Sequence, residues 1–70
     1  MTLKSAREGR EYVVQKVNVD DRELKAFLFT LGLYSGEKIC VISHRHSGCT
    51  VKIKNARYSI DSRLAAAIIV

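Results

Sequence analysis

The stretch "LFTLGLYSGEKI", from Leu28 to Ile39, predicts where the main helix of this chain ends and where its main sheet begins. Two glycines, Gly32 and Gly36, lie four residues apart within it. The apolar residues before Gly32 recur with helical spacing, whereas those after Gly36 alternate as in a strand. Because glycine readily adopts the left-handed backbone conformation that ends helices, the stretch predicts a helix end followed at once by a turn into a strand.

The helix that ends at Gly32 is predicted to begin at Asp20. Asp20 is a suitable N-cap, and Glu23 follows three residues later as in a capping box. Apolar residues at helical spacing predict one buried stripe, formed by Leu24, Phe27, Leu28 and Leu31. With Gly32 at the first position beyond the helix, Leu33 can contact Leu28, as in a Schellman motif.

The segment "EKICVISHRHSGCTVKIKN" is predicted to form a β-hairpin. A two-residue turn at Ser47-Gly48 would place its two apolar sets on opposite faces. A three-residue loop, with Gly48 in the left-handed conformation, instead pairs Arg45 with Cys49 and Val41 with Ile53. We therefore expect the three-residue loop. The face opposite the apolar one would then carry Lys38, Cys40, Ile42, His44, Lys52 and Lys54.

The two ends of the chain are predicted to meet. The β-rich stretch 11–19 changes the parity of its apolar residues halfway, which requires a bulge or bend. After a turn at Asn55-Ala56 we expect a strand with Tyr58 and Ile60 on one face, then a single helical turn around 61–65. The apolar end 68–70 would form a last strand that pairs with the first and closes a small barrel, which removes exposed edges.

The composition allows one small domain, 1–70. The chain has 70 residues, 47% of them apolar, and a net charge of +5. Cys40 and Cys49 are too few for a disulfide scaffold, so we expect free thiols in a reducing compartment. No apolar stretch approaches the roughly 18 residues that span a bilayer, and the N-terminus lacks a signal-peptide pattern. These features predict a cytoplasmic protein without direct membrane insertion.

The chain resembles the ferrous iron transport protein A family, FeoA, over nearly its whole length. The resemblance rests on Leu31-Gly32-Leu33 followed by Gly36, and on Tyr58-Ser59-Ile60, Ala65 and the final Ile68-Ile69-Val70. It implies an all-β fold with one short helix, a small SH3-like β-barrel. It also implies a cytosolic, non-enzymatic accessory or regulatory protein of bacterial ferrous iron uptake. The implied partner is the membrane iron transporter FeoB, which carries a cytosolic GTPase domain.

The residues themselves do not indicate catalysis, a nucleotide site or a cofactor. The acidic residues near 20–23 are accounted for by helix capping, and no group is evident that would orient a Cys-His pair. A phosphate site needs glycines at a helix N-terminus, whereas Gly32 lies at a helix C-terminus, where the dipole repels anions.

A metal centre is also not predicted. Cys40, His44, His46 and Cys49 carry suitable donor atoms for zinc. On a straight strand, however, Cys40 and His44 lie about 13 Å apart at their α-carbons. Whether His44 and His46 share an ion is left open, as is the oligomeric state.

Nucleic acid is the main alternative partner. The segment 38–57 carries five Lys and Arg residues and no acid, which could bind phosphates. It contains no aromatic residue on which bases could stack, which argues against this partner. The runner-up is therefore a free-standing SH3-like module that binds nucleic acid or a transcriptional regulator.

Phe29, Leu33 and Tyr34 are the candidate partner-binding residues. Phe29 is rotated about 140° from the middle of the predicted apolar stripe at 100° per residue, and Tyr34 follows the helix end. Both rings should lie near the same helix end, with Leu33 beneath them. Exposed aromatic residues in a patch are typical of a partner surface. Alternatively, Phe29 folds over the mouth of the barrel and Tyr34 plugs its rim.

Overall fold

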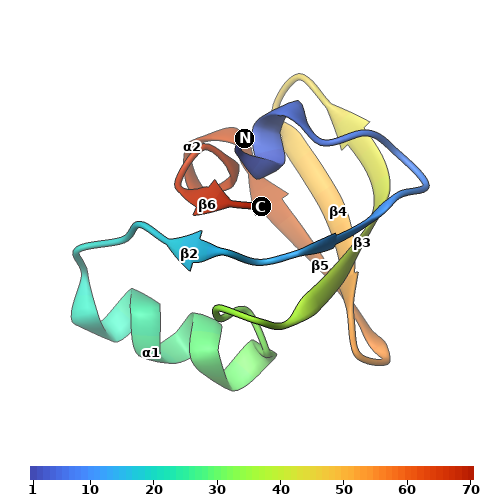
Figure 1. Ribbon diagram of the computed structural model, residues 1–70. Coiled ribbons are helices and arrows are strands. Elements are labelled where there is room, and N and C mark those ends of the chain that lie inside the picture. Colours follow the sequence, from blue (N-terminus) through green and yellow to red (C-terminus); the bar gives the residue numbers. More distant parts are fainter.

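The computed structural model describes all residues from Met1 to Val70 and consists of short strands, one main helix and one helical turn (Figure 1). A 3₁₀ turn at Leu3–Ser5 precedes the first strand. The elements that follow are β1 (Glu11–Val13), β2 (Lys16–Val17), α1 (Arg22–Leu31), β3 (Lys38–Arg45), β4 (Gly48–Ile53), β5 (Ala56–Asp61), α2 (Ser62–Ala65) and β6 (Ile68–Ile69). The predicted fold class, mostly β with one short helix, is confirmed.

The strands form two sheets. An antiparallel sheet has the order β1-β3-β4-β5, and β2 pairs with β6 in a second, two-stranded sheet. The predicted change of parity is a real bend, because the chain leaves the first sheet after Val13 and joins the second at Lys16. The last strand does pair with the first β-rich segment, but only with its second half. The two sheets therefore share no continuous ladder, and the predicted full closure of the barrel is wrong in this respect.

The two ends of the chain lie side by side (Figure 1). Thr2 forms an isolated bridge with Ile69, and the backbone N–H of Val70 donates to the carbonyl of Met1 at 2.9 Å. The core between the sheets contains residues from almost every element. Its largest fully buried side chains are Leu3, Val14, Leu33, Ile39, Val41, Val51, Ile53 and Ile68.

The N-terminus of α1 differs from the prediction by one residue. The N-cap is Asp21, whose carboxylate accepts hydrogen bonds from the backbone N–H groups of Glu23 and Leu24. Asp20 lies one residue too early to reach them. Either aspartate could cap a helix by its chemistry, and only the path of the chain from β2 selects between them.

The β3–β4 hairpin has a different register from the predicted one. Arg45 pairs with Gly48, so the turn contains only His46 and Ser47, and Ile42 is an extra residue in β3. This β-bulge has the same effect on the apolar faces as one more residue in the loop. Gly48 has φ of 154° and not a left-handed helical value. The next turn is also shifted, because Ile53 pairs with Ala56 around Lys54-Asn55.

Candidate protein-binding groove

The C-terminus of α1 is built by Gly32, as predicted. Gly32 has φ of 95°, its N–H donates to the carbonyl of Phe29, and the N–H of Leu33 donates to the carbonyl of Leu28 at 2.9 Å. These two hydrogen bonds are those of a Schellman motif. The motif turns the chain back beside the helix, and Tyr34 is thereby brought next to Phe29.

Phe29 and Tyr34 form an aromatic pair at this helix end. Their ring centroids are 4.7 Å apart and their planes are inclined by 31°. Phe29 is 63% exposed, so it does not fold over the mouth of the barrel. Tyr34 is half-buried, and Leu33 is only 2% exposed. The structure therefore brings the three candidate residues together, two of them reaching the surface and one in the core below.

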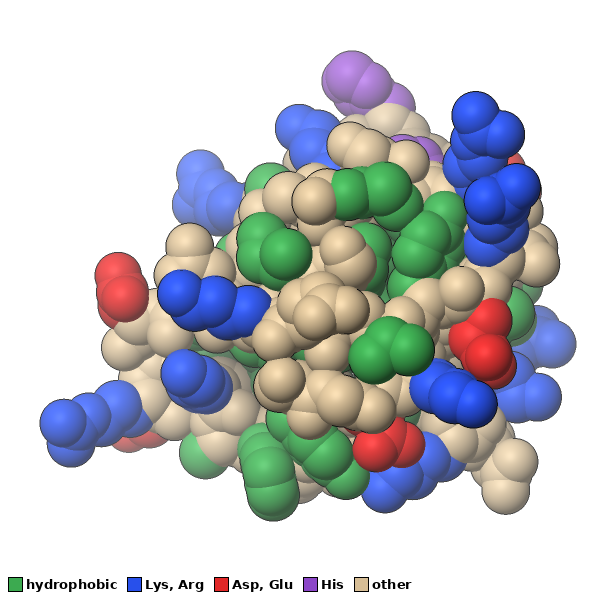
Figure 2. Space-filling view, viewed as in Figure 1, with side chains coloured by type: hydrophobic (Ala, Val, Ile, Leu, Met, Phe, Trp, Pro, Cys, Tyr) green, Lys and Arg blue, Asp and Glu red, His purple; other side chains and the backbone are tan.

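The pair lies along a groove between α1 and the segment that contains β2, with a volume of about 860 Å³. We call it the aromatic groove and define it by its apolar lining, which is Val17, Ala26, Phe29, Leu33 and Tyr34. In the space-filling view, apolar side chains reach the surface at the end of the molecule where α1 ends (Figure 2).

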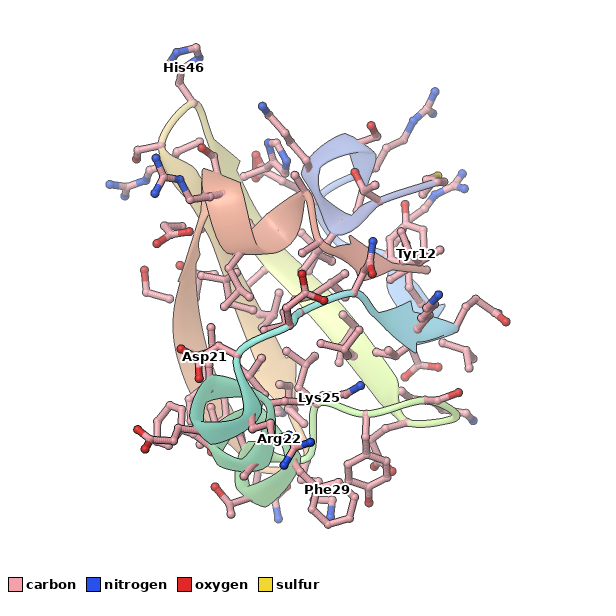
Figure 3. The ribbon with its side chains drawn as sticks, turned by 90° about the vertical axis from the view of Figure 1, so that its left-hand side faces the viewer. Tyr12, Asp21, Arg22, Lys25, Phe29 and His46 are labelled. Atoms are coloured by element: carbon pink, nitrogen blue, oxygen red, sulfur yellow. The ribbon has the colours of Figure 1, made fainter.

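Positive charges border the aromatic groove on both sides. Lys16 lies on the β2 side, and Arg22 and Lys25 lie on α1, while no carboxylate lines the groove. Arg22, Lys25 and Phe29 project from the same side of the helix (Figure 3). A fourth cation, the Lys54 ammonium, lies 6.0 Å from the centroid of the Tyr34 ring. The groove is thus apolar at its floor and cationic at its rim.

The predicted apolar stripe of α1 is only partly buried. Leu28 is in the core and Leu31 is half-buried, but Leu24 is 37% exposed and Phe27 is 58% exposed. Only Leu28 and Leu31, one helical turn apart, pack against the core, so the buried face of the helix is narrow. The sequence prediction of the site does not include Lys16, Arg22 and Lys25. The spacing i, i+3, i+7 of Arg22, Lys25 and Phe29 would have placed them on one face.

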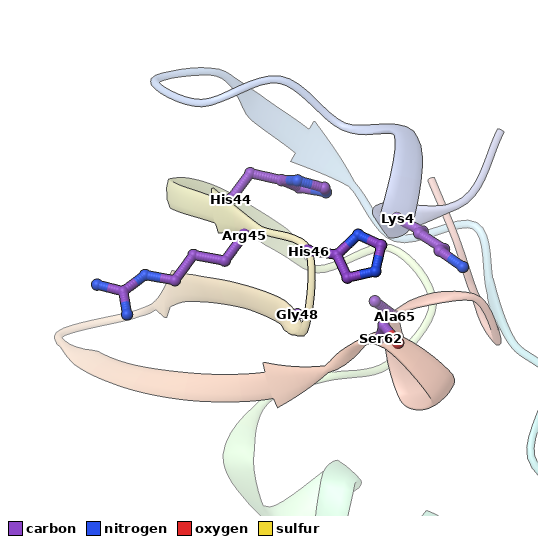
Figure 4. A pocket seen from close by; sticks show the side chains of 7 residues that line it. All are labelled: Lys4, His44, Arg45, His46, Gly48, Ser62 and Ala65. Carbon is purple, nitrogen blue, oxygen red and sulfur yellow. The ribbon is translucent and has the colours of Figure 1, made fainter.

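The hairpin side chains do not assemble a metal centre. No three His, Cys, Asp or Glu residues come close enough to hold an ion. The bulge at Ile42 places His44 opposite the buried Cys49, on the core-facing side of the sheet, so its predicted place on the face opposite the apolar one is wrong. His44 and His46 instead border a shallow pocket of about 370 Å³ with Lys4, Arg45 and Ser62, and Arg45 extends away from the others (Figure 4).

Both cysteines are free, in agreement with the sequence prediction. Cys49 belongs to the core, and burial raises the pKa of its thiol. Cys40 pairs with the exposed Lys52 and is half-buried, so the two sulfur atoms lie on opposite sides of the sheet.

The fold and the aromatic groove define a small SH3-like β-module with a surface suited to binding another molecule. None of its helices has the length and apolar composition needed to cross a bilayer. The chain belongs to the FeoA domain family, whose model matches residues 1–70. Membership of this family implies an accessory role in ferrous iron transport. This is a family of small accessory domains and not a known family of enzymes. Comparison with curated proteins finds no match.

Solved structures share this fold at low sequence identity. An iron uptake regulatory protein, FeoA, is 20% identical with a TM-score of 0.84, and the match covers 97% of this chain and 91% of that one. A FeoA protein of Stenotrophomonas maltophilia in complex with zinc is also 20% identical, with a TM-score of 0.84, and the match covers 100% and 88% of the two chains. A manganese-dependent transcriptional repressor is 21% identical with a TM-score of 0.84, over 97% of this chain but only 39% of the repressor.

Proposed function

We propose that this protein is a cytoplasmic accessory protein of bacterial ferrous iron uptake, and that it acts by binding the cytosolic part of the membrane iron transporter FeoB. Family membership supports the link to iron transport. The Stenotrophomonas maltophilia relative is described as a candidate activating factor of bacterial ferrous iron transport. The binding surface is proposed from one observation: Phe29 and Tyr34 form an aromatic pair that reaches the surface above the buried Leu33.

A partner is expected to cover this pair because exposure of aromatic rings to water is unfavourable. A phenylalanine that is 63% exposed stabilises the free protein little, whereas burial of an aromatic ring contributes about 1.5–3 kcal/mol. Aromatic residues that enter a desolvated contact often dominate binding. Phe29 and Tyr34 are therefore proposed as the anchors, and Leu33 as the floor that a partner side chain contacts.

The test is binding of the purified protein to the cytosolic domain of FeoB from the same bacterium. The double variant Phe29→Ser with Tyr34→Ser should weaken binding by at least about 2 kcal/mol, as loss of binding anchors does, which is about 30-fold in Kd. Its free energy of unfolding should stay within about 1 kcal/mol of the wild type, as for surface changes.

Phe27→Ser is the matched control, because Phe27 is 58% exposed on the same helix but does not line the groove. It should leave the affinity unchanged. A folded double variant that binds FeoB at full affinity would refute this surface and direct attention to the face that carries Lys52 and Lys54. A double variant that unfolds would show that the aromatic pair belongs to the fold.

Nucleic acid or a transcriptional regulator remains the alternative partner. The repressor relative shares the fold over only part of its own length, so its likeness concerns the fold alone. The basic hairpin exposes Lys52 and Arg57, but Tyr58 is half-buried on the other side of its strand. No stacking platform accompanies these charges, and the FeoB proposal is therefore preferred.

A further inference from the structure

We propose that the segment of the partner that occupies the aromatic groove is an amphipathic α-helix with acidic residues on both sides of its apolar face. This inference rests on the proposed function, because it names the chemistry of the element that the groove would recognise. It is carried by three features of the groove: the sign of its charges, their positions on opposite walls, and the depth of its apolar floor.

The charges of the groove call for an anionic ligand. Lys16, Arg22 and Lys25 line it, and no Asp or Glu does. The Asp21 carboxylate, next to Arg22 in the sequence, is directed at the backbone N–H groups of Glu23 and Leu24 and does not line the groove. Complementary charge steers a partner and excludes partners of the wrong sign. A basic segment would therefore be rejected here, whatever its apolar content.

The positions of the charges indicate a helix in place of an extended chain. Lys16 is on the β2 wall, whereas Arg22 and Lys25 are on the α1 wall. An occupant that satisfies both walls needs acids on each side of an apolar ridge. An amphipathic helix has this arrangement, with apolar residues at i, i+3, i+4 and i+7 and polar residues on both flanks.

The depth of the groove argues against a membrane surface as the occupant. Its apolar lining includes Leu33, 2% exposed, and Val17, 8% exposed, together with the Phe29 ring, 63% exposed. Side chains on a rod-shaped segment can enter such a hollow, whereas a flat bilayer meets only its rim. The volume of about 860 Å³ lies in the range of roughly 300–1,000 Å³ typical of ligand pockets.

The test uses two synthetic helical peptides that share length and apolar positions. One carries Glu on both flanks, and the other carries Lys at the same places. Calorimetry with the protein should show binding of the Glu peptide and at least about tenfold weaker binding of the Lys peptide, because like charges oppose association. The affinity for the Glu peptide should fall as salt is added, because salt screens exposed charges.

Reversal of the charges on the α1 wall tests whether Arg22 and Lys25 recognise the acidic flanks of the peptide. The double variant Arg22→Glu with Lys25→Glu should reverse the preference, so that the Lys peptide binds better than the Glu peptide. The variant should fold, because acidic residues in the first turn favour a helix. Lys52→Glu with Arg57→Glu makes the same change in net charge on an exposed sheet face and should leave the preference unchanged.

The outcomes separate this inference from the proposed function. The inference is overturned if both peptides bind equally, or if the protein binds vesicles of phosphatidylcholine and phosphatidylglycerol through Phe29 while showing no preference for the Glu peptide. It is also overturned if FeoB binding needs Phe29 and Tyr34 but is unaffected by the Arg22 and Lys25 reversal, and in that case the proposed function stands. If FeoB binds but does not need Phe29 and Tyr34, only the proposed surface is refuted, whereas no binding to FeoB at all would overturn the proposed function.

Discussion

Gly32 and Ile53 are in such close contact that Gly32 has no room for a side chain. A Cβ on Gly32 would lie 2.9 Å from the Cγ2 atom of Ile53, a distance that real Cβ atoms essentially never show. The end of α1 is thereby pressed directly onto β4. Phe29 lies one turn earlier in the same helix.

Gly32→Ala should destabilise the protein more than Gly36→Ala. Both glycines have a left-handed backbone, with φ of 95° and 92°, so alanine costs about 1–2 kcal/mol of strain at either position. Only at Gly32 must Ile53 also shift, since nothing lies within 4 Å of a Cβ at Gly36. Urea unfolding of the two variants isolates the cost of the contact. Equal midpoints for the two variants would show that Ile53 yields without cost.

Gly48→Ala should be the most damaging of the glycine substitutions. A Cβ at Gly48 would collide with the carbonyl oxygen of Ile60 and would lie 2.8 Å from the α-carbon of Asp61, both of which are backbone atoms of β5. Backbone cannot move aside as a flexible side chain can, so the β4–β5 pairing must open. We expect a loss of more than about 3 kcal/mol, above the roughly 0.5–3 kcal/mol of most single substitutions. A folded variant of near wild-type stability would contradict the close approach.

The sequence specifies the elements of this fold better than their registers. The end of α1 at Gly32 and the helical turn after Asp61 follow from local chemistry, namely a left-handed glycine and an N-cap aspartate. The β3–β4 register does not, because a bulge at Ile42 with a short turn buries Val41 and Val51 just as a longer loop would. Apolar parity alone cannot distinguish these two solutions.

The candidate site could be predicted only in part. The sequence places Phe29 and Tyr34 at one helix end, because both positions follow from the helix period and the C-cap. It does not place Lys16 across a groove from Lys25, since that arrangement depends on how the segment with β2 packs against the helix. The sequence also predicts that Phe27 is buried, whereas it is 58% exposed in the structure. The helical period defines an apolar face, but only the packed barrel decides how wide the buried part of that face is.

The choice between two adjacent aspartates can be tested by substitution. Asp21→Ala should cost about 1 kcal/mol, because the carboxylate of Asp21 accepts hydrogen bonds from the N–H groups of Glu23 and Leu24. Asp20→Ala removes the same charge one residue earlier and should change the free energy of unfolding by less than about 0.5 kcal/mol. Urea unfolding of both variants provides the measurement. A larger loss for Asp20→Ala would place the N-cap at Asp20 after all.

The two thiols should differ strongly in reactivity. Burial raises the pKa of the Cys49 thiol, so at any given pH a smaller fraction of Cys49 is the reactive thiolate, and the reagent must also reach the core. Cys40 is half-buried on the outer face of β3 and is accessible without unfolding. An aromatic disulfide reagent at mildly alkaline pH should therefore modify Cys40 quickly and Cys49 only at the rate of opening of the fold. The Cys40→Ser variant isolates the slow thiol, and urea should abolish the difference. Two equally fast thiols in the native protein would contradict the buried position of Cys49, and a native monomer without free thiol would contradict the placement of the cysteines on opposite sides of the sheet.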